Sequence, residues 1–117
     1  MIKEKEADVL HSVLKTLSAF GVFAWRSNNM GVRRSRGGKD FYTFAGIRGV
    51  SDIIAVHPHT GQIICIECKA TGKLNQQSHE QAFFQHDIER NGGIYLLVDN
   101  YEQIIKWIEE NIKKVKT

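Results

Sequence analysis

The stretch Ile63-Ile64-Cys65-Ile66-Glu67-Cys68-Lys69 decides the fold of this chain, because it ends an apolar run with two charged residues at alternate positions. Residues two apart in a β-strand project from the same face, so Glu67 and Lys69 stand side by side with Cys68 on the opposite face. The pattern predicts a buried strand over Gln62–Ala70 whose end carries a carboxylate beside an ammonium group.

A second apolar run, predicted to be a strand over Asp52–His57, begins with another acid. Pro58 and Gly61 supply turn residues between the two strands, and a short connection would bring Asp52 and Glu67 together. Two carboxylates about 4 Å apart repel by ~1 kcal/mol in water and by ~4 kcal/mol at the effective dielectric of a partly buried site. Such a pair normally shares a proton or a cation, and we expect a cation.

The remaining patterns predict an α/β fold. The expected elements are a helix over Ile2–Phe20, a strand over Val22–Arg26, strands over Asp52–His57 and Gln62–Ala70, a helix that follows the polar stretch Thr71–His79 and reaches about Arg90, a strand over Ile94–Val98, and a helix capped by Asn100. Phe41–Phe44 fits either a further short strand or part of a loop. The first strands would form one sheet, which the strand after the crossover helix would join in parallel.

Two polar side chains fall on helix faces that are otherwise apolar. At about 100° per residue, Glu6 lies about 40° from Leu10 and therefore on the core-facing stripe of the first helix. Gln81 shares a face of the second helix with Phe84, and Gln77 lies one turn earlier. Gln81 taken alone is explained equally well as an amide at the edge of the core.

A basic stretch runs from Arg26 to Arg48, where five arginines and Lys39 stand against the single acid Asp40, although the net charge of the chain is only +3. Interspersed glycines predict a flexible loop that can follow a phosphate backbone. A solvated loop that binds nothing explains the isolated stretch equally well.

Length and composition indicate one globular domain covering residues 1–117, with 42% hydrophobic and 25% charged residues. The longest apolar runs fall far short of the roughly 20 residues that cross a bilayer, and the first six residues do not resemble a signal peptide. We therefore expect a cytosolic protein.

The residues singled out above resemble the VRR-NUC family of PD-(D/E)xK nucleases, and the resemblance covers nearly the whole chain. The matching segments are Trp25-Arg26 followed by Asn28, Arg48-Gly49-Val50-Ser51-Asp52, Ile66-Glu67-Cys68-Lys69, and Gln81-Ala82-Phe83-Phe84 with Gly92-Gly93 after the helix. Ser51 stands where the family usually has proline. The segment between Lys69 and Gln81 is a few residues longer than is common, which leaves Gln77 as a competitor for the role of Gln81.

The resemblance implies a restriction-endonuclease-like αβββαβ core, with a central mixed sheet flanked by helices and an added C-terminal helix. It also implies divalent-metal-dependent cleavage of DNA phosphodiester bonds in replication, repair or recombination. Small members of the family look like Holliday-junction resolvases, and many are phage-encoded. By analogy we expect a homodimer that acts on branched DNA, in the host cytoplasm if a phage encodes it.

The expected site has three charged groups at its centre. Asp52 and Glu67 offer the oxygen ligands that Mg²⁺ or Mn²⁺ prefers, and the resemblance adds the backbone carbonyl of Cys68. Lys69 would orient or deprotonate the attacking water and offset charge that develops on phosphorus.

Further residues join this centre by the same resemblance. Glu6 would complete the metal shell, directly or through water, or tether Lys69. Gln81 would hold Lys69 or the water by hydrogen bonds. The basic residues expected to contact DNA are Arg26, Arg33, Arg34, Arg36, Lys39 and Arg48.

Other interpretations stay open from the sequence. A zinc site at Cys65-x-x-Cys68 with His57 and His59 is disfavoured, because residues three apart on a strand face opposite sides. The charged residues could form a salt-bridge cluster without chemistry, although buried clusters are usually no more stabilising than apolar packing. The same fold could also bind a DNA junction without cutting it, or act on RNA, which differs from DNA by its 2′-hydroxyl groups.

Overall fold

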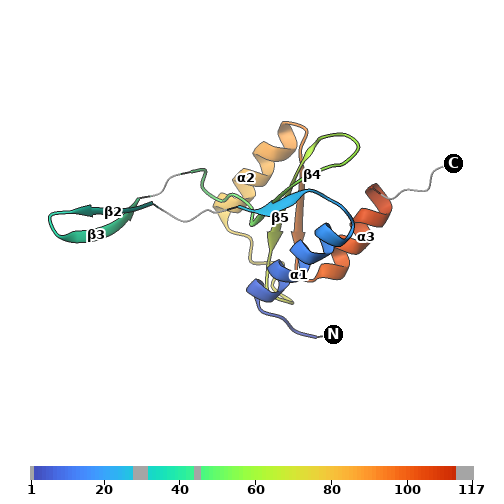
Figure 1. The fold of residues 1–117 in the computed structure, drawn as a ribbon, viewed down its shortest axis with the longest axis horizontal. Helices are drawn as coiled ribbons and strands as arrows, with labels where there is room; N and C mark the ends of the chain where they lie inside the picture. Colours follow the sequence, from blue (N-terminus) through green and yellow to red (C-terminus); the bar gives the residue numbers. More distant parts are fainter. Residues whose placement is uncertain (1, 28–31, 44–45, 113–117) are drawn as a thin grey trace.

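The computed structural model describes residues 2–27, 32–43 and 46–112, with the backbone alone for residues 32–34 and 41–43. Within these ranges the chain forms an α/β fold of helices and strands (Figure 1). The elements are α1 (Glu6–Ala19), β1 (Ala24–Arg26), β2 (Val32–Arg36), β3 (Lys39–Thr43), β4 (Ile53–Val56), β5 (Ile63–Cys68), α2 (His79–Arg90), β6 (Ile94–Val98) and α3 (Tyr101–Asn111).

The centre of the fold is a mixed four-stranded sheet in the order β1-β4-β5-β6. β1 pairs with β4, and β4 with β5, in antiparallel fashion, whereas β5 and β6 are parallel. The pairing of Ile53 with Ile66 brings the start of β4 against the end of β5. The predicted mixed sheet, with a parallel strand after the crossover helix α2, is confirmed.

Both faces of this sheet carry apolar side chains, because the strands have apolar residues at odd and at even positions. Helices therefore pack on both faces. α1 and α3 pack side by side (Figure 1) in one layer, where Val13, Ile66 and Ile108 are fully buried. The other layer contains Phe84 of α2, which packs edge to face against Tyr95 of β6. The end of β5 therefore lies between two helical layers.

Residues 32–43 form an antiparallel hairpin, β2–β3, so the prediction of a flexible basic loop is wrong for this segment. Arg36 pairs with Lys39 across Gly37-Gly38, whose φ angles of +59° and +77° suit a tight hairpin turn. A Gly-Gly pair between potential strands is a hairpin signal that the surrounding charges obscured. In Figure 1 the hairpin stands apart from the central sheet. Of Phe41–Phe44, for which the sequence left a strand or a loop open, residues 41–43 belong to β3, and Phe44 lies outside the described residues.

The first helix begins later than predicted, at Glu6 rather than Ile2. Two hydrogen bonds join Glu4, in the segment before the helix, to Thr71 in the loop after β5. The Glu4 N–H donates to Thr71 Oγ1 at 2.9 Å, and the Thr71 N–H donates to the Glu4 carbonyl at 3.0 Å. These long-range bonds keep the chain before α1 out of the helix. The helical spacing of the sequence carries no information about them.

The central strands are shorter than predicted at the ends that carry charge. β4 starts at Ile53 and β5 ends at Cys68, so Asp52 and Lys69 lie one residue beyond the strands. β1 is shorter than predicted at its other end: it covers Ala24–Arg26 and leaves out Val22 and Phe23. Asp52 and Lys69 are therefore placed just beyond the strands, whereas Glu67 lies within β5.

Helices α2 and α3 begin at side-chain caps. Ser78 Oγ accepts the Gln81 N–H at 3.1 Å, and Asn100 Oδ1 accepts the Gln103 N–H at 3.0 Å. Asn100 is therefore the cap of the last helix, as predicted, and Gln103 Oε1 in addition accepts the Asp99 N–H at 2.8 Å. In the described part of the chain, no helix combines the length and the apolar character needed to cross a membrane.

Candidate functional site

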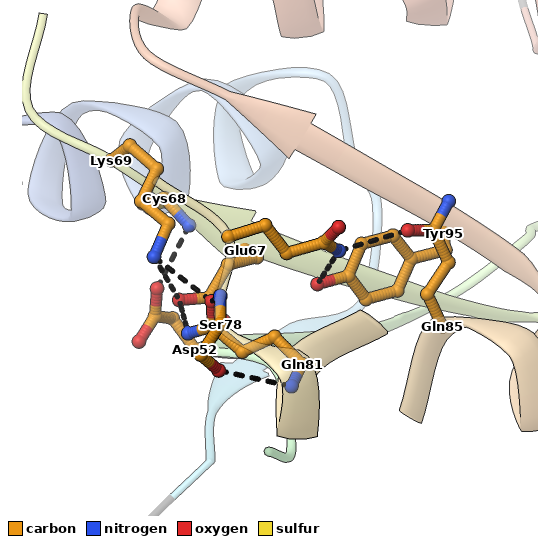
Figure 2. Close-up of polar contacts among 9 residues, drawn as sticks. Asp52, Glu67, Cys68, Lys69, Ser78, Gln81, Gln85 and Tyr95 are labelled. Carbon is orange, nitrogen blue, oxygen red and sulfur yellow. Dashed lines mark hydrogen bonds and ion pairs between the residues drawn. The ribbon is translucent and has the colours of Figure 1, made fainter. Parts of the chain in front are cut away.

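Asp52 and Glu67 converge at one end of the sheet, as the short connection between their two strands predicted. Asp52 Oδ2 accepts a hydrogen bond from the Cys68 N–H at 2.8 Å, which ties the residue before β4 to the end of β5. Glu67 lies on β5 and is 3% exposed. Figure 2 shows the two carboxylates beside the side chains of Lys69 and Gln81.

Lys69 and Gln81 complete a hydrogen-bonded cluster around Glu67. Lys69 Nζ donates to Gln81 Oε1 at 2.9 Å and lies 3.8 Å from Glu67 Oε2. Gln81 Nε2 donates to the same carboxylate oxygen at 2.8 Å. One amide therefore contacts both charged groups and holds the ammonium beside the carboxylate.

Gln81 occupies this position because it belongs to the first turn of α2. Its Oε1 also accepts the Ser78 N–H at 2.9 Å, so the amide that contacts the cluster completes the capping box of the helix. Gln77 lies before the helix and donates to Gln85 Oε1 at 2.8 Å and to the Tyr95 hydroxyl at 3.4 Å. Of the two glutamines that the sequence left open, Gln81 is the one at the charged cluster.

Burial raises the pKa of Glu67 to about 8, and the charge of Asp52 acts in the same direction. The Lys69 ammonium lowers this pKa, and Glu6 adds a smaller increase. The attraction of Lys69 therefore does not offset the cost of burying the charge. Glu67 is left to share a proton or to bind a cation.

The geometry of Glu67 suits a ligand of a cation. Its Oε1 is buried and receives no hydrogen bond from an N–H or O–H group of the described residues, so the pairing with Asp52 that raises its pKa requires a proton shared by the two carboxylates. Buried carboxylate oxygens are normally paired. Within the described ranges, no group of three or more His, Cys, Asp or Glu side chains is placed to hold a metal ion. Mg²⁺ often uses only one or two carboxylates and keeps several waters, so Asp52 and Glu67 suit it. The backbone of Cys68, the implied third oxygen donor, lies against Asp52 through its N–H.

A hollow of about 170 Å³ lies next to this cluster, lined by Glu6, Ala7, Leu10, His11, Arg26 and Asp52. One water takes about 30 Å³ in the liquid, so the hollow has room for several waters. The prediction that Glu6 lies on the buried stripe is wrong: it is exposed, because it is the first residue of α1 and precedes the buried turn. Its carboxylate nevertheless borders the hollow together with Asp52 and Arg26.

The two cysteines of β5 face opposite layers. Cys65 packs with Phe84 on one side of the sheet, and Cys68 lies in the α1 and α3 layer on the other. Both thiols are free, and burial raises the pKa of both. His57 Nδ1 accepts backbone N–H groups of its own turn. The zinc interpretation is therefore wrong, because the two sulfur atoms cannot share one ion.

The loop before Asp52 packs against the start of α2 through Gly49, to which the sequence analysis gave no separate role. Gly49 has a φ of +76°, and a β-carbon there would lie 2.2 Å from the Glu80 carbonyl oxygen. Arg48 lies 3.4 Å from Glu80 in an exposed ion pair. A lone glycine in a polar segment signals a turn but does not identify the element that it touches.

The candidate DNA-contacting residues are divided between the sheet and the hairpin. Arg26 ends β1 at the hollow, and Arg48 is exposed in the loop before β4. Arg36 and Lys39 are exposed on either side of the hairpin turn. The side chains of Arg33 and Arg34, and the whole of Asn28, lie outside the described residues.

The sequence matched neither the models of known protein families nor any of the curated proteins with which it was compared. The resemblance to the VRR-NUC family therefore rests on the residue pattern alone.

Proposed function

We propose that this protein is a divalent-metal-dependent nuclease that hydrolyses DNA phosphodiester bonds, with the β1-β4-β5-β6 sheet as a restriction-endonuclease-like core. The observation that carries the proposal is the unpaired Glu67 Oε1 beside Asp52, in a cluster that also holds Lys69 and Gln81. Strongly perturbed pKa values are concentrated at functional sites. A cluster kept only for stability would normally have no unpaired buried oxygen.

The two carboxylates supply what phosphodiester hydrolysis requires. A phosphodiester repels nucleophiles through its negative charge, and a Mg²⁺ or Mn²⁺ ion held by Asp52 and Glu67 would offset that charge and make water more acidic near neutral pH. The Cys68 N–H fixes the orientation of the Asp52 carboxylate in advance. Glu67 would release its proton when it takes up the ion.

Lys69 would act on water and phosphate beside these ligands. Its ammonium is held by Gln81 Oε1 at 2.9 Å, while the same amide holds Glu67 at 2.8 Å. We assign Lys69 the role of orienting the attacking water and offsetting the charge that develops on phosphorus. Gln81 is a positioning residue, which fixes the ammonium relative to the carboxylate.

Positive charge outside the cluster supports a nucleic acid substrate. Arg26 lines the hollow next to Asp52, and Arg36 and Lys39 are exposed on the hairpin. A two-stranded ribbon is narrow enough to enter the major groove of B-DNA, so the hairpin would contact DNA away from the scissile bond. Branched DNA as substrate and a homodimer with paired sites stay part of the proposal, on the strength of the resemblance.

The proposal is tested by cutting of a fluorescent four-way DNA junction with Mg²⁺, Mn²⁺ or EDTA. We expect metal-dependent cutting that is lost in Asp52→Ala and Lys69→Ala and kept in Lys73→Ala, a control at an exposed lysine in the loop after β5. Cutting that survives both site substitutions would contradict the proposal. Metal-independent binding of the junction without cutting would instead indicate a subunit that only holds DNA, and an RNA junction tests the choice of nucleic acid.

A further inference from the structure

Phe23 and Trp25 form an exposed aromatic pair on the edge of the central sheet. Phe23 is 71% exposed and Trp25 is 44% exposed, and their ring centroids lie 5.3 Å apart. Ala24 between them packs against the α1 and α3 layer, so the two rings project from the opposite face of the sheet. Neighbouring exposed rings of this kind mark a binding surface.

The aromatic pair continues directly from the charged cluster. Trp25 pairs with Ile54 across β1 and β4, and Ile54 lies two residues from Asp52, on the same face. The Trp25 ring and the Asp52 carboxylate are therefore on the same face of the sheet, on neighbouring strands and near one end of it. The next residue after Trp25, Arg26, projects from the opposite face, towards α1, where it lines the hollow that Asp52 also borders.

We infer that Phe23 and Trp25 form a stacking platform for an unpaired nucleobase whose neighbouring phosphate lies at the end of the sheet that carries Asp52. The inference rests on the proposed function and specifies its substrate class: DNA with a single-stranded segment next to the bond that is cut. In a continuous duplex both faces of each base are covered by its neighbours, so the platform has nothing to bind. Stacking on aromatic rings tolerates any base, so the platform selects DNA by structure rather than by sequence.

A nucleobase fits this patch better than a second copy of the chain. An aromatic side chain buries about 150–250 Å² at most, so the two rings together cover no more than about 500 Å². A standard protein interface buries roughly 800 Å² on each partner. β1 has three residues and offers few backbone hydrogen bonds to another strand. The patch is therefore too small for a standard protein interface, whereas a single base needs no more than the area of two rings.

The first experiment measures stacking on Trp25 directly. The chain has two tryptophans, so Trp107→Phe leaves Trp25 as the only one. This variant is titrated with a single-stranded thymidine oligonucleotide in EDTA, so that neither metal nor cutting contributes. We expect saturable quenching of the tryptophan fluorescence, and an unchanged spectrum at saturating oligonucleotide would overturn the inference.

The second experiment measures the affinity that the platform contributes. Phe23→Ala/Trp25→Ala is compared with Phe83→Ala/Tyr101→Ala, a control that removes rings exposed to 71% and 41% on the helices. Fluorescence anisotropy in EDTA should show the platform variant binding the single strand roughly 5- to 150-fold more weakly, while the control binds normally. Affinity for a blunt continuous duplex should change less than twofold in either variant. Far-ultraviolet circular dichroism confirms that both variants fold.

The outcomes separate this inference from the proposed function. If the platform variant loses affinity equally for single strand and duplex, or loses affinity for neither, the platform is overturned, even if cutting still depends on Asp52. Size-exclusion chromatography that shows the platform variant changing from dimer to monomer, with single-strand affinity intact, would assign the patch to a second copy instead. Cutting that is independent of Asp52 would remove the proposed function without altering the stacking result.

Discussion

Gly49 lies so close to Glu80 that a β-carbon at position 49 would be 2.2 Å from the Glu80 carbonyl oxygen and 2.8 Å from the Gln81 nitrogen. The contact joins the loop that leads into Asp52 to the first turn of α2, which carries Gln81. The distance between the carboxylate pair and the glutamine is therefore set by a backbone contact outside the charged cluster.

Replacing Gly49 by alanine should disturb both stability and cutting. The left-handed backbone at φ +76° costs a non-glycine residue about 1–3 kcal/mol, and the clash with Glu80 displaces the loop in addition. Gly72→Ala is the matched control, because its φ is +86° and nothing lies within 4 Å of the added carbon. Gly49→Ala should lose more stability in urea unfolding, and more of the junction-cutting rate, than Gly72→Ala. Equal effects in the two variants would mean that the contact with Glu80 contributes nothing.

Removing the amide of Gln81 should weaken the site more than removing that of Gln77. Gln81 contacts both Glu67 and Lys69, and loss of a residue that orients metal ligands typically lowers activity or metal affinity 10- to 100-fold. We expect Gln81→Ala to lower the cutting rate by about this factor and to raise the Mn²⁺ concentration at half-maximal rate. Gln77→Ala, which removes contacts to Gln85 and Tyr95 only, should leave the metal dependence unchanged. The reverse order of effects would assign the positioning role to Gln77.

The stability of the metal-free protein should fall as pH rises from about 4.5 to 8. Burial raises the pKa of Glu67 from an ordinary value of 4.5 to about 8, so between these values the folded state binds a proton that the unfolded chain has released. This contribution is complete below the lower value and lost above the upper one. Glu67→Gln keeps an oxygen for Gln81 without the charge, so it should be more stable than the unmodified protein at pH 8.5 but not at pH 4.5.

Urea unfolding in EDTA at both pH values checks this prediction. Glu109→Gln, which changes an exposed glutamate of α3, serves as the control and should follow the unmodified protein. If Glu67→Gln loses stability equally at both pH values, ionisation of the buried Glu67 carboxylate does not lower the stability of the folded state.

Divalent metal should stabilise the protein through the same residues. An ion that binds only the folded state adds about 2.7 kcal/mol when its free concentration is 100 times its Kd. We expect Mn²⁺ to raise the unfolding temperature at pH 8 in the unmodified protein, and to have little effect on Asp52→Asn or Glu67→Gln. An equal increase in all three proteins, measured by thermal unfolding, would place the ion elsewhere.

Neutralising the basic residues of the hairpin should reduce the salt dependence of duplex binding. Each phosphate contact contributes about 0.9 to the slope of log K against log salt, so changing Arg33, Arg34, Arg36 and Lys39 to glutamine should lower the slope by up to about 3.6. The control changes exposed lysines outside the hairpin to glutamine, at positions Lys3, Lys15, Lys73 and Lys106. Anisotropy titrations at several salt concentrations measure both slopes, and an unchanged slope in the hairpin variant would remove the hairpin from the DNA interface.

The local pattern of the chain was sufficient to predict much of the central sheet. The alternation around Glu67 places Cys65 and Cys68 in opposite layers, and the apolar run of β6 after a helix joins β5 in parallel. It also predicted that Asp52 would meet Glu67, since a short connection between antiparallel strands leaves few alternative registers. Strand periodicity and short-range connection are properties of neighbouring residues, so a single sequence contains them.

Only the tertiary structure decided how the helices and loops complete the site. The start of α2 selects Gln81 over Gln77, the start of α1 leaves Glu6 exposed at the hollow, and the contact between Gly49 and Glu80 fixes the loop against the helix. These features depend on the positions of segments that are distant in the sequence. Helical periodicity identifies the faces of a helix, but the residue at which the helix begins and the surface it meets are determined by contacts with the rest of the fold.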